Sequence, residues 1–585
     1  MTRADQSVDN IAAPPRWSML LLTLVALALA TVVWVAPDAV AGRLTVTALP
    51  EGASLDYART LLRNLAMTSS AAMLVLVAWW GWSGRVRAVS LGRWCLVASM
   101  GLYFAAAASM WWYVDDDAGI SFTYARNLAE GRGLVYNPGD APVEGYSNPL
   151  WVLILAGARL THFDIIWTAK VLGLSFGSLC LVLMWRAFRD QHPAAWLALP
   201  LAALNASAVV WTSSGLENAL HAFLLTAIIV LVPAAEKRSQ VSWLLVIVLA
   251  ALVLSRPEGF MFAVAVAAFL AVRARLRGDS LKPVLVTIGV PLIVLVGLLI
   301  FREVYFGYLL PNTFYAKASS SNPLRLLNPG SGGWQYLAEG VSGCGWTMGL
   351  LPMLVAIALP RKWGATVAIA ALVVGAQIFF VVSVGGDWMK EFRFLAPVAP
   401  AVSILIGIGL GRVCELAGSL GRRAAAASAV LVALVIYPQV HRLIAFAYAP
   451  TTPLQTVAAI GDYFKALGHE AGIEDPTLLH HDAGGTSFIA RIHLIDLAGL
   501  CDPVIAHHWR DRERIRKYIF EEQKPDFIYS GPHFARRIGL EQFPEFQSDY
   551  VALPPPPTPV LDGYIRRVRR DLYPKLFGEM PTSAG

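Results

Sequence analysis

The sequence predicts a polytopic α-helical membrane protein that carries a smaller α/β domain at its C-terminal end. Composition is the first reason: 56% of the 585 residues are hydrophobic and 15% are charged, whereas soluble globular chains have roughly 45 to 50% apolar residues. The second is the recurrence of apolar stretches of about 16 to 22 residues, the length at which a helix crosses a bilayer core. The third is a change to mixed polar sequence with short strand-like runs after residue 440.

About thirteen apolar stretches are candidate membrane-spanning helices, because a helix satisfies its own backbone hydrogen bonds inside lipid. Two of them are separated only by Arg256-Pro257 and are also compatible with one broken hairpin. Residues 149–160 are too few to span, so we expect a helix in the outer interface there. The candidates are 17–35, 66–82, 93–113, 167–187, 194–211, 218–235, 242–255, 258–272, 283–301, 344–359, 364–383, 396–411 and 424–440.

Basic residues in alternate loops orient these helices. With a cytoplasmic N-terminus, the inner loops collect most of the basic residues between the spans, which is the positive-inside pattern. The formal net charge of +7 therefore mostly reflects the orientation of the helices in the membrane, and no nucleic-acid partner is expected. An odd number of spans then puts the chain after residue 440 outside. The inner basic residues are Arg85, Arg87, Arg93, Arg186, Arg189, Lys237, Arg238, Arg273, Arg275, Arg277, Lys282, Arg361, Lys362, Arg412, Arg422 and Arg423.

Two domains follow from this topology. Residues 1–440 form a transmembrane domain whose first outer loop is 114–166, and residues 441–585 form an outer α/β domain. In the outer domain we expect a helix at 456–467 and strands in TLLHH, FIARIHLIDL and 524–529. His480-His481-Asp482 either turns a strand, which we favour, or contacts a substrate. The five cysteines are scattered, without a disulfide framework or metal-ligand spacing.

Three consecutive carboxylates, Asp115, Asp116 and Asp117, directly follow an apolar segment. Like charges that are partly buried together are costly unless a cation, a proton or a substrate hydroxyl stabilises them. The cluster is therefore a candidate for chemistry, with Asp116 or Asp117 taking a proton from a hydroxyl. The alternative is a solvated loop cap. A divalent cation is compatible with these acids, although no ligand spacing requires one.

Five loops with polar motifs are expected on the same outer face. Each motif alone also has a structural explanation, such as a turn, a helix break or a helix N-cap. Together they suit a ligand with a sugar, a phosphate and a lipid tail, because arginine and lysine bind phosphate and aromatic rings stack on sugars or lie at the interface. Besides the two catalytic candidates, the substrate-binding candidates are Asp115, Glu144, Tyr146, Asn148, Glu217, Arg256, Glu258, Asn312, Tyr315, Lys317, Asp387, Trp388 and Arg393.

The series of motifs resembles a known family. DDAGISFTYARNLAEGRGLVYNPG, VEGYSNPLW, SGLENAL, RPEG, PNTFYAK, GGDWM, HDAGGTSF and DLAGLCDP are similar to the GT-C glycosyltransferases of the mycobacterial terminal arabinofuranosyltransferase type. The resemblance spans most of the chain. It departs from the family at Gly119, where an aromatic residue is frequent, and at Thr123, where a basic residue is frequent.

The resemblance implies a GT-C bundle in a bacterial inner membrane, with the active site and the C-terminal domain on the periplasmic face. It implies transfer of a sugar, arabinofuranose first, from a polyprenyl monophosphate to a glycan, lipid-linked glycan or surface-protein acceptor. The reaction would invert the anomeric carbon with Asp116 or Asp117 as base, and it requires no cofactor.

Three alternatives remain at this level. The first is a transferase for mannose or another hexose on the same carrier. The second is a transporter of an anionic lipid, although transport sites tend to lie near the membrane midplane between internal repeats. The third is a non-catalytic assembly protein.

Overall fold

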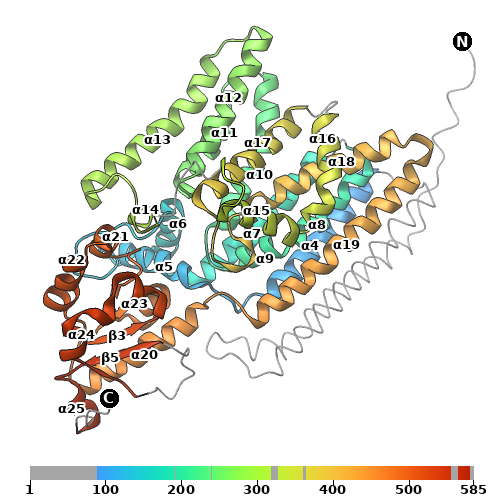
Figure 1. Cartoon of the computed structure of the whole chain (residues 1–585). Coiled ribbons are helices and arrows are strands. Elements are labelled where there is room, and N and C mark those ends of the chain that lie inside the picture. The colour runs from blue at the N-terminus through green and yellow to red at the C-terminus, as the bar shows by residue number, and fades with distance from the viewer. Residues whose placement is uncertain are drawn as a thin grey trace, which may run out of the picture.

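The structure is a computed structural model that describes residues 88–579, with gaps at 190, 239, 318–326, 360–363 and 555–563. Long helices lie side by side in an elongated bundle, and the C-terminal domain is attached at one end of it (Figure 1). The expected spans at 17–35 and 66–82 lie outside the described residues.

Among the described residues, seven helices are long and apolar enough to cross a membrane, or nine spans if two bent helix pairs count as one each. The bent pairs turn by 49° between α8 and α9 and by 80° between α15 and η4. The expected span at 344–359 is thus half of a bent unit, which turns at Gly345 in the left-handed region (φ 71°). The bundle helices are α4 (Ala88–Ser109), α7 (Ile165–Phe188), η1 (Pro193–Leu197), α8 (Ala198–Ala203), α9 (Ala206–Ser213), α10 (Asn218–Arg238), α11 (Trp243–Ser255), α12 (Gly259–Arg277), α13 (Lys282–Phe306), α15 (Gly332–Gly343), η4 (Trp346–Gly349), α16 (Leu350–Ala358), α17 (Gly364–Val384), α18 (Ala399–Leu416) and α19 (Gly421–Tyr448).

Burial separates the centre of the bundle from its periphery. In the apolar stretch that contains α18, 89% of the residues are buried, against 11% in α13. Large apolar side chains such as Ile293 and Val304 are exposed on α13, at 71% and 82%. An apolar surface of this kind is stable in lipid and unfavourable in water.

The break between α11 and α12 lies where the sequence placed it. Arg256 is extended (φ −160°, ψ 154°), because the ring of Pro257 disfavours helical backbone in the preceding residue. The two segments form separate helices with Arg256 at their junction, and that junction carries part of the site described below.

Two further helices form the first loop after α4, and the sequence predicted only the one at residues 149–160. α5 (Asp116–Ala129) begins immediately after Asp115, and α6 (Pro149–Leu160) starts with proline in its first turn, where no backbone N–H is needed. Both lie between the end of the bundle and the C-terminal domain (Figure 1).

The C-terminal domain contains a five-stranded sheet in the order β2-β1-β3-β5-β4. β1 pairs in parallel with β2 and β3, whereas β5 is antiparallel to β3 and β4. The strands are β1 (Thr477–His480), β2 (His493–Asp496), β3 (Phe527–Ser530), β4 (Tyr550–Ala552) and β5 (Ile565–Arg569). The helices are α20 (Leu454–Glu470), η8 (Thr486–Ala490), α21 (Pro503–His508), α22 (Arg512–Lys517), η9 (Tyr518–Gln523), α23 (Pro532–Ile538), η10 (Leu540–Gln542), α24 (Pro544–Ser548) and α25 (Tyr573–Phe577).

Two local predictions from the sequence are wrong in this part of the chain. The run FIARIHLIDL is only half strand, because Thr486–Ala490 forms the π-helix η8 and β2 begins at His493. The phenyl ring of Phe488 packs on Phe122 of α5, with ring centroids 5.3 Å apart, so tertiary contact overrides the strand propensity of this run. In addition, α19 continues to Tyr448, beyond the expected domain boundary at residue 440.

Candidate functional site

Asp115 is the N-cap of α5 and joins that helix to the start of the C-terminal domain. Its carboxylate accepts a hydrogen bond from the Asp117 amide at 3.1 Å and from the Thr451 hydroxyl at 3.0 Å, and the Tyr113 hydroxyl donates to it as well. Burial and the charge of Asp117 together raise the pKa of Asp115 to about 7. These contacts give Asp115 a structural role, because a side-chain oxygen at an N-cap satisfies an otherwise unpaired helix amide.

Asp116 is bound by the backbone of the C-terminal domain. Its two carboxylate oxygens accept hydrogen bonds from the amides of Gly485 at 2.7 Å and Gly484 at 3.0 Å. A Cβ on Gly484 would lie 1.8 Å from the carbonyl oxygen of Asp116, so this approach requires glycine. Burial and the charge of Asp482 raise the pKa of Asp116, whereas the two amides lower it.

Asp117 is the accessible acid of the three. Its side chain is 28% exposed, and its Oδ2 accepts from Arg393 Nη1 at 3.1 Å. Arg393 also donates from Nε to Asp387 at 2.7 Å. Lys317, an exposed residue, is close enough to interact electrostatically with Arg393 and with the carboxylates of Asp117 and Asp387. Two cations and two carboxylates from three separate loops therefore meet at the start of α5.

The loop that carries Arg393 is fixed by side chains from the bundle. The carbonyls of residues 391 to 394 accept in turn from Trp211 at 2.9 Å, Ser207 at 3.2 Å, Asn218 at 3.2 Å and Gln377 at 2.6 Å. Glu391 and Phe392 both have positive φ, at 56° and 48°. Left-handed backbone at non-glycine residues costs roughly 1 to 2 kcal/mol each and persists where the surroundings over-determine it, as they do at functional sites.

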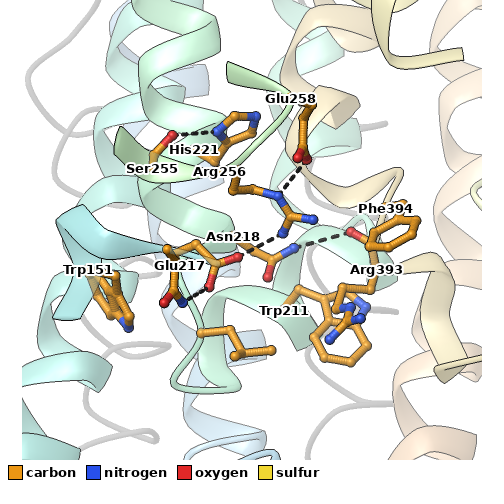
Figure 2. A network of polar contacts seen from close by, with 12 residues as sticks. Trp151, Trp211, Glu217, Asn218, His221, Ser255, Arg256, Glu258, Arg393 and Phe394 are labelled. Atoms are coloured by element: carbon orange, nitrogen blue, oxygen red, sulfur yellow. Dashed lines mark hydrogen bonds and ion pairs between the residues drawn. The ribbon is translucent and has the colours of Figure 1, made fainter. Parts of the chain in front are cut away.

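Arg256 lies in a buried network beside this loop (Figure 2). Its Nη1 donates to Glu217 at 2.8 Å and its Nε donates to Glu258 at 2.6 Å. Glu217 accepts in addition from Asn148 at 2.6 Å, and the Ser121 hydroxyl of α5 donates to Asn148 at 3.1 Å. Two of the five guanidinium N–H donors of Arg256 are thus engaged by buried carboxylates, which gives this arginine a structural role in the junction. The network connects α5 to the α11–α12 junction.

Other candidates lie at joints between segments. Glu144 accepts two hydrogen bonds from Arg302 at the end of α13, at 2.7 and 2.9 Å. The Asn312 amide donates to the carbonyls of Gly499 and Leu500 in the C-terminal domain, at 2.8 and 3.0 Å. Glu144 and Asn312 therefore connect the bundle, the first outer loop and the C-terminal domain to one another.

The aromatic candidates divide into packed and exposed rings. Tyr146 packs on Tyr124 with ring centroids 4.7 Å apart, and Tyr315 packs on His507 of α21 at 4.3 Å. Trp388 is 71% exposed. The first two rings are therefore engaged with protein, whereas Trp388 is free to contact lipid or substrate.

Comparisons with known proteins place the fold. Residues 452–568 match a family described as a domain of unknown function, DUF8728, and no curated protein matches the chain. ArnT from Cupriavidus metallidurans, in its crystal structure bound to undecaprenyl phosphate, is similar with a TM-score of 0.52 and 16% identity over 80% of this chain and 98% of that chain. Its apo crystal structure is similar with a TM-score of 0.50 and 15% identity, over 80% and 96% of the two chains. The chain has the GT-C fold. The expected fold class is thereby confirmed, with a helical membrane bundle and a C-terminal α/β domain.

Within this GT-C fold, several residues near the acids were not selected from the sequence. Gly484 and Gly485 bind Asp116, and their only sequence signal is a glycine pair after an acid at a strand end. The turn favoured for His480-His481-Asp482 is present, since β1 ends at His480, and the same turn faces the acid cluster.

Lys170 was also missed. It is a buried lysine of the GT-C bundle that donates from Nζ to the carbonyl of Ser213 at 2.7 Å and to that of Tyr113. It thereby joins the ends of α4 and α9 just before the acid cluster. A lone lysine in an otherwise apolar helix is the signal that could have found it.

No group of three or more His, Cys, Asp or Glu among the described residues is arranged to hold a metal ion. The independence from a cofactor, and the compatibility with a divalent cation, stay predictions.

Proposed function

We propose that this chain is a membrane glycosyltransferase that takes a sugar from a polyprenyl monophosphate on the outer face of a bacterial inner membrane. Arabinofuranose is the first candidate for the sugar and mannose the second, and the acceptor is a glycan or a glycoconjugate. The fold supports the class, since ArnT is similar along nearly its whole length and was solved with undecaprenyl phosphate.

The observation that carries the proposal is the pairing of Asp117 with Arg393 at the start of α5. Asp115 caps a helix and both oxygens of Asp116 are bound by amides. Asp117 is therefore the acid of this cluster that is placed to meet a substrate, and we assign it as the base. The sequence left Asp116 and Asp117 as alternative bases, and this proposal selects Asp117.

The reaction is a single displacement at the anomeric carbon. The acceptor hydroxyl gives its proton to the Asp117 carboxylate while its oxygen forms the new glycosidic bond. The bond from the sugar to the phosphate oxygen breaks, and its electron pair leaves with the polyprenyl phosphate. Arg393 and Lys317 stabilise that departing charge, Arg393 by directed hydrogen bonds and Lys317 as a compact cation. Displacement from the opposite side inverts the anomeric configuration.

The test is sugar transfer by purified full-length protein from polyprenyl-phosphate arabinofuranose, with the mannose-linked carrier beside it. Asp117→Asn is expected to lower kcat by roughly 10²- to 10⁴-fold, the usual contribution of a positioned base. Asp140→Asn serves as the control, because Asp140 is an exposed acid of the same outer loop. Transfer by Asp117→Asn at the wild-type rate would reject the base. Absence of turnover with both carriers would reject the enzyme and favour a lipid transporter.

A further inference from the structure

The loop after β1 in the C-terminal domain lies directly against α5. Besides the two glycine amides that bind Asp116, the carbonyls of Phe488 and Ser487 accept from Arg126 of α5 at 2.7 and 3.2 Å. The Tyr136 hydroxyl, from the same outer loop as α5, donates to the carbonyl of Ala483. The loop is thus fixed against the first outer loop over residues 483–488, directly after Asp482, in a region that matches a domain family of unknown function.

Asp482 is two residues before the glycine pair and its side chain is 27% exposed. None of the described residues donates a hydrogen bond to its carboxylate. Burial raises the pKa of Asp482, His481 at 3.7 Å opposes that shift, and the charge of Asp117 adds to it, which places the two acids in one electrostatic environment. A largely buried carboxylate without donors is unfavourable, so a ligand that supplies donors stabilises it.

His480 provides a second, independent observation at the same place. Its Nδ1 contacts the carbonyl of Tyr529 at 2.7 Å and must carry a proton to do so, because a carbonyl only accepts. Burial lowers the pKa of His480 to about 4, so the ring is neutral and its Nε2 has a lone pair. That Nε2 is buried without a hydrogen-bond partner among the described residues, and it points at Asp482 Oδ2 across 3.6 Å.

The two sides of the site therefore differ in chemistry. On one side, Arg393 and Lys317 are cations suited to phosphate. On the other side, the carboxylates of Asp117 and Asp482 are hydrogen-bond acceptors, and the fully buried Nε2 of neutral His480, 3.6 Å from Asp482 Oδ2, offers that carboxylate no donor. Such a set disfavours phosphate and carboxylate groups and suits a ligand that presents several hydroxyl donors, as a neutral glycan does.

We propose that Asp482 binds the acceptor glycan, and that with Asp117 it holds two neighbouring hydroxyl groups of a neutral sugar at the junction between α5 and the C-terminal domain. The inference rests on the proposed function and extends it: the domain of unknown function supplies the acceptor side of the site, and the bundle supplies the donor side.

The experiment measures steady-state transfer by the purified full-length protein to a synthetic octyl arabinofuranoside, varying donor and acceptor separately. Asp482→Asn keeps the shape of the side chain and removes its charge. We expect its acceptor KM to rise about ten- to a hundredfold, the effect of losing a hydrogen bond to a charged group, while its donor KM changes less than twofold. Asp482→Ser, which also removes the carboxylate, is expected to show the same split. The matched control is Asp475→Asn, an exposed acid of the same domain, which should match wild type.

An acceptor KM of both Asp482 variants equal to that of wild type would overturn the inference alone, as would an equal rise in donor and acceptor KM. Wild-type protein that neither transfers nor hydrolyses any polyprenyl-phosphate sugar would overturn the proposed function and this inference with it. The two failures are therefore distinguishable in one set of measurements.

Discussion

Replacing Arg256 by methionine tests whether this arginine stabilises the fold through its ion pairs or binds the phosphate of the donor. The substitution keeps an apolar stem and removes the guanidinium that joins Glu217 to Glu258. Glu258 has a side chain that is 2% exposed, and Glu217 one that is 7% exposed. Both carboxylates would remain buried without their cation, a change that typically costs about 3 to 5 kcal/mol.

That loss of unfolding free energy predicts a measurable fall in the melting temperature. Unfolding entropy is roughly 2.1 cal/mol/K per residue, which for 585 residues amounts to about 1.2 kcal/mol/K. Arg256→Met is therefore expected to lower Tm by about 2.5 to 4 °C in the same detergent. Adding Glu258→Gln to Arg256→Met should recover part of the loss, because it removes one of the two unpaired charges.

Arg514→Met is the matched control, since Arg514 forms an exposed pair with Glu522 and such pairs contribute little. The assay is thermal unfolding of purified protein, followed by the donor KM of each variant that folds. An Arg256→Met protein that melts with wild type but has a donor KM raised more than tenfold would refute the structural interpretation. It would identify Arg256 as a phosphate ligand.

Two further predictions concern positions outside the proposed reaction centre. Lys170→Met should lower both Tm and kcat. The buried carbonyls of Ser213 and Tyr113 lose their donor, at about 1 to 3 kcal/mol each, and the chain just before Asp115 loses its anchor. Wild-type turnover in this variant would contradict the anchoring role. Burial raises the pKa of Asp496 from 3.8 to about 7, so the folded chain binds this proton more tightly than the unfolded chain, and the resulting stability is complete below pH 3.8 and lost as pH rises to about 7. Asp496→Asn should flatten the dependence of Tm on pH across that window. An unchanged slope of Tm against pH would show that other groups cause the dependence.

The sequence alone determined the helical membrane architecture and the break at Arg256-Pro257, whereas the bends between α8 and α9 and between α15 and η4 were found only in the structure. Hydrophobic runs specify helices in lipid because only length and apolarity matter there. The helix at Pro149–Leu160 and the interruption at Arg256-Pro257 are local properties of the chain, and the structure has both. The α/β character of the C-terminal domain was likewise visible from alternating apolar residues and turns.

Only the tertiary structure decided how the polar residues divide their roles. Three adjacent aspartates have the same local chemistry, and their difference comes from partners far along the chain. Asp116 is bound by amides 368 and 369 residues away, whereas Asp117 meets Arg393, 276 residues away. Arg256 is a candidate phosphate ligand in the sequence, and the folded chain places two buried glutamates beside it. The physical reason is that hydrogen-bond partners and burial fix the accessibility and pKa of a side chain, and the folded chain brings those partners together from distant segments.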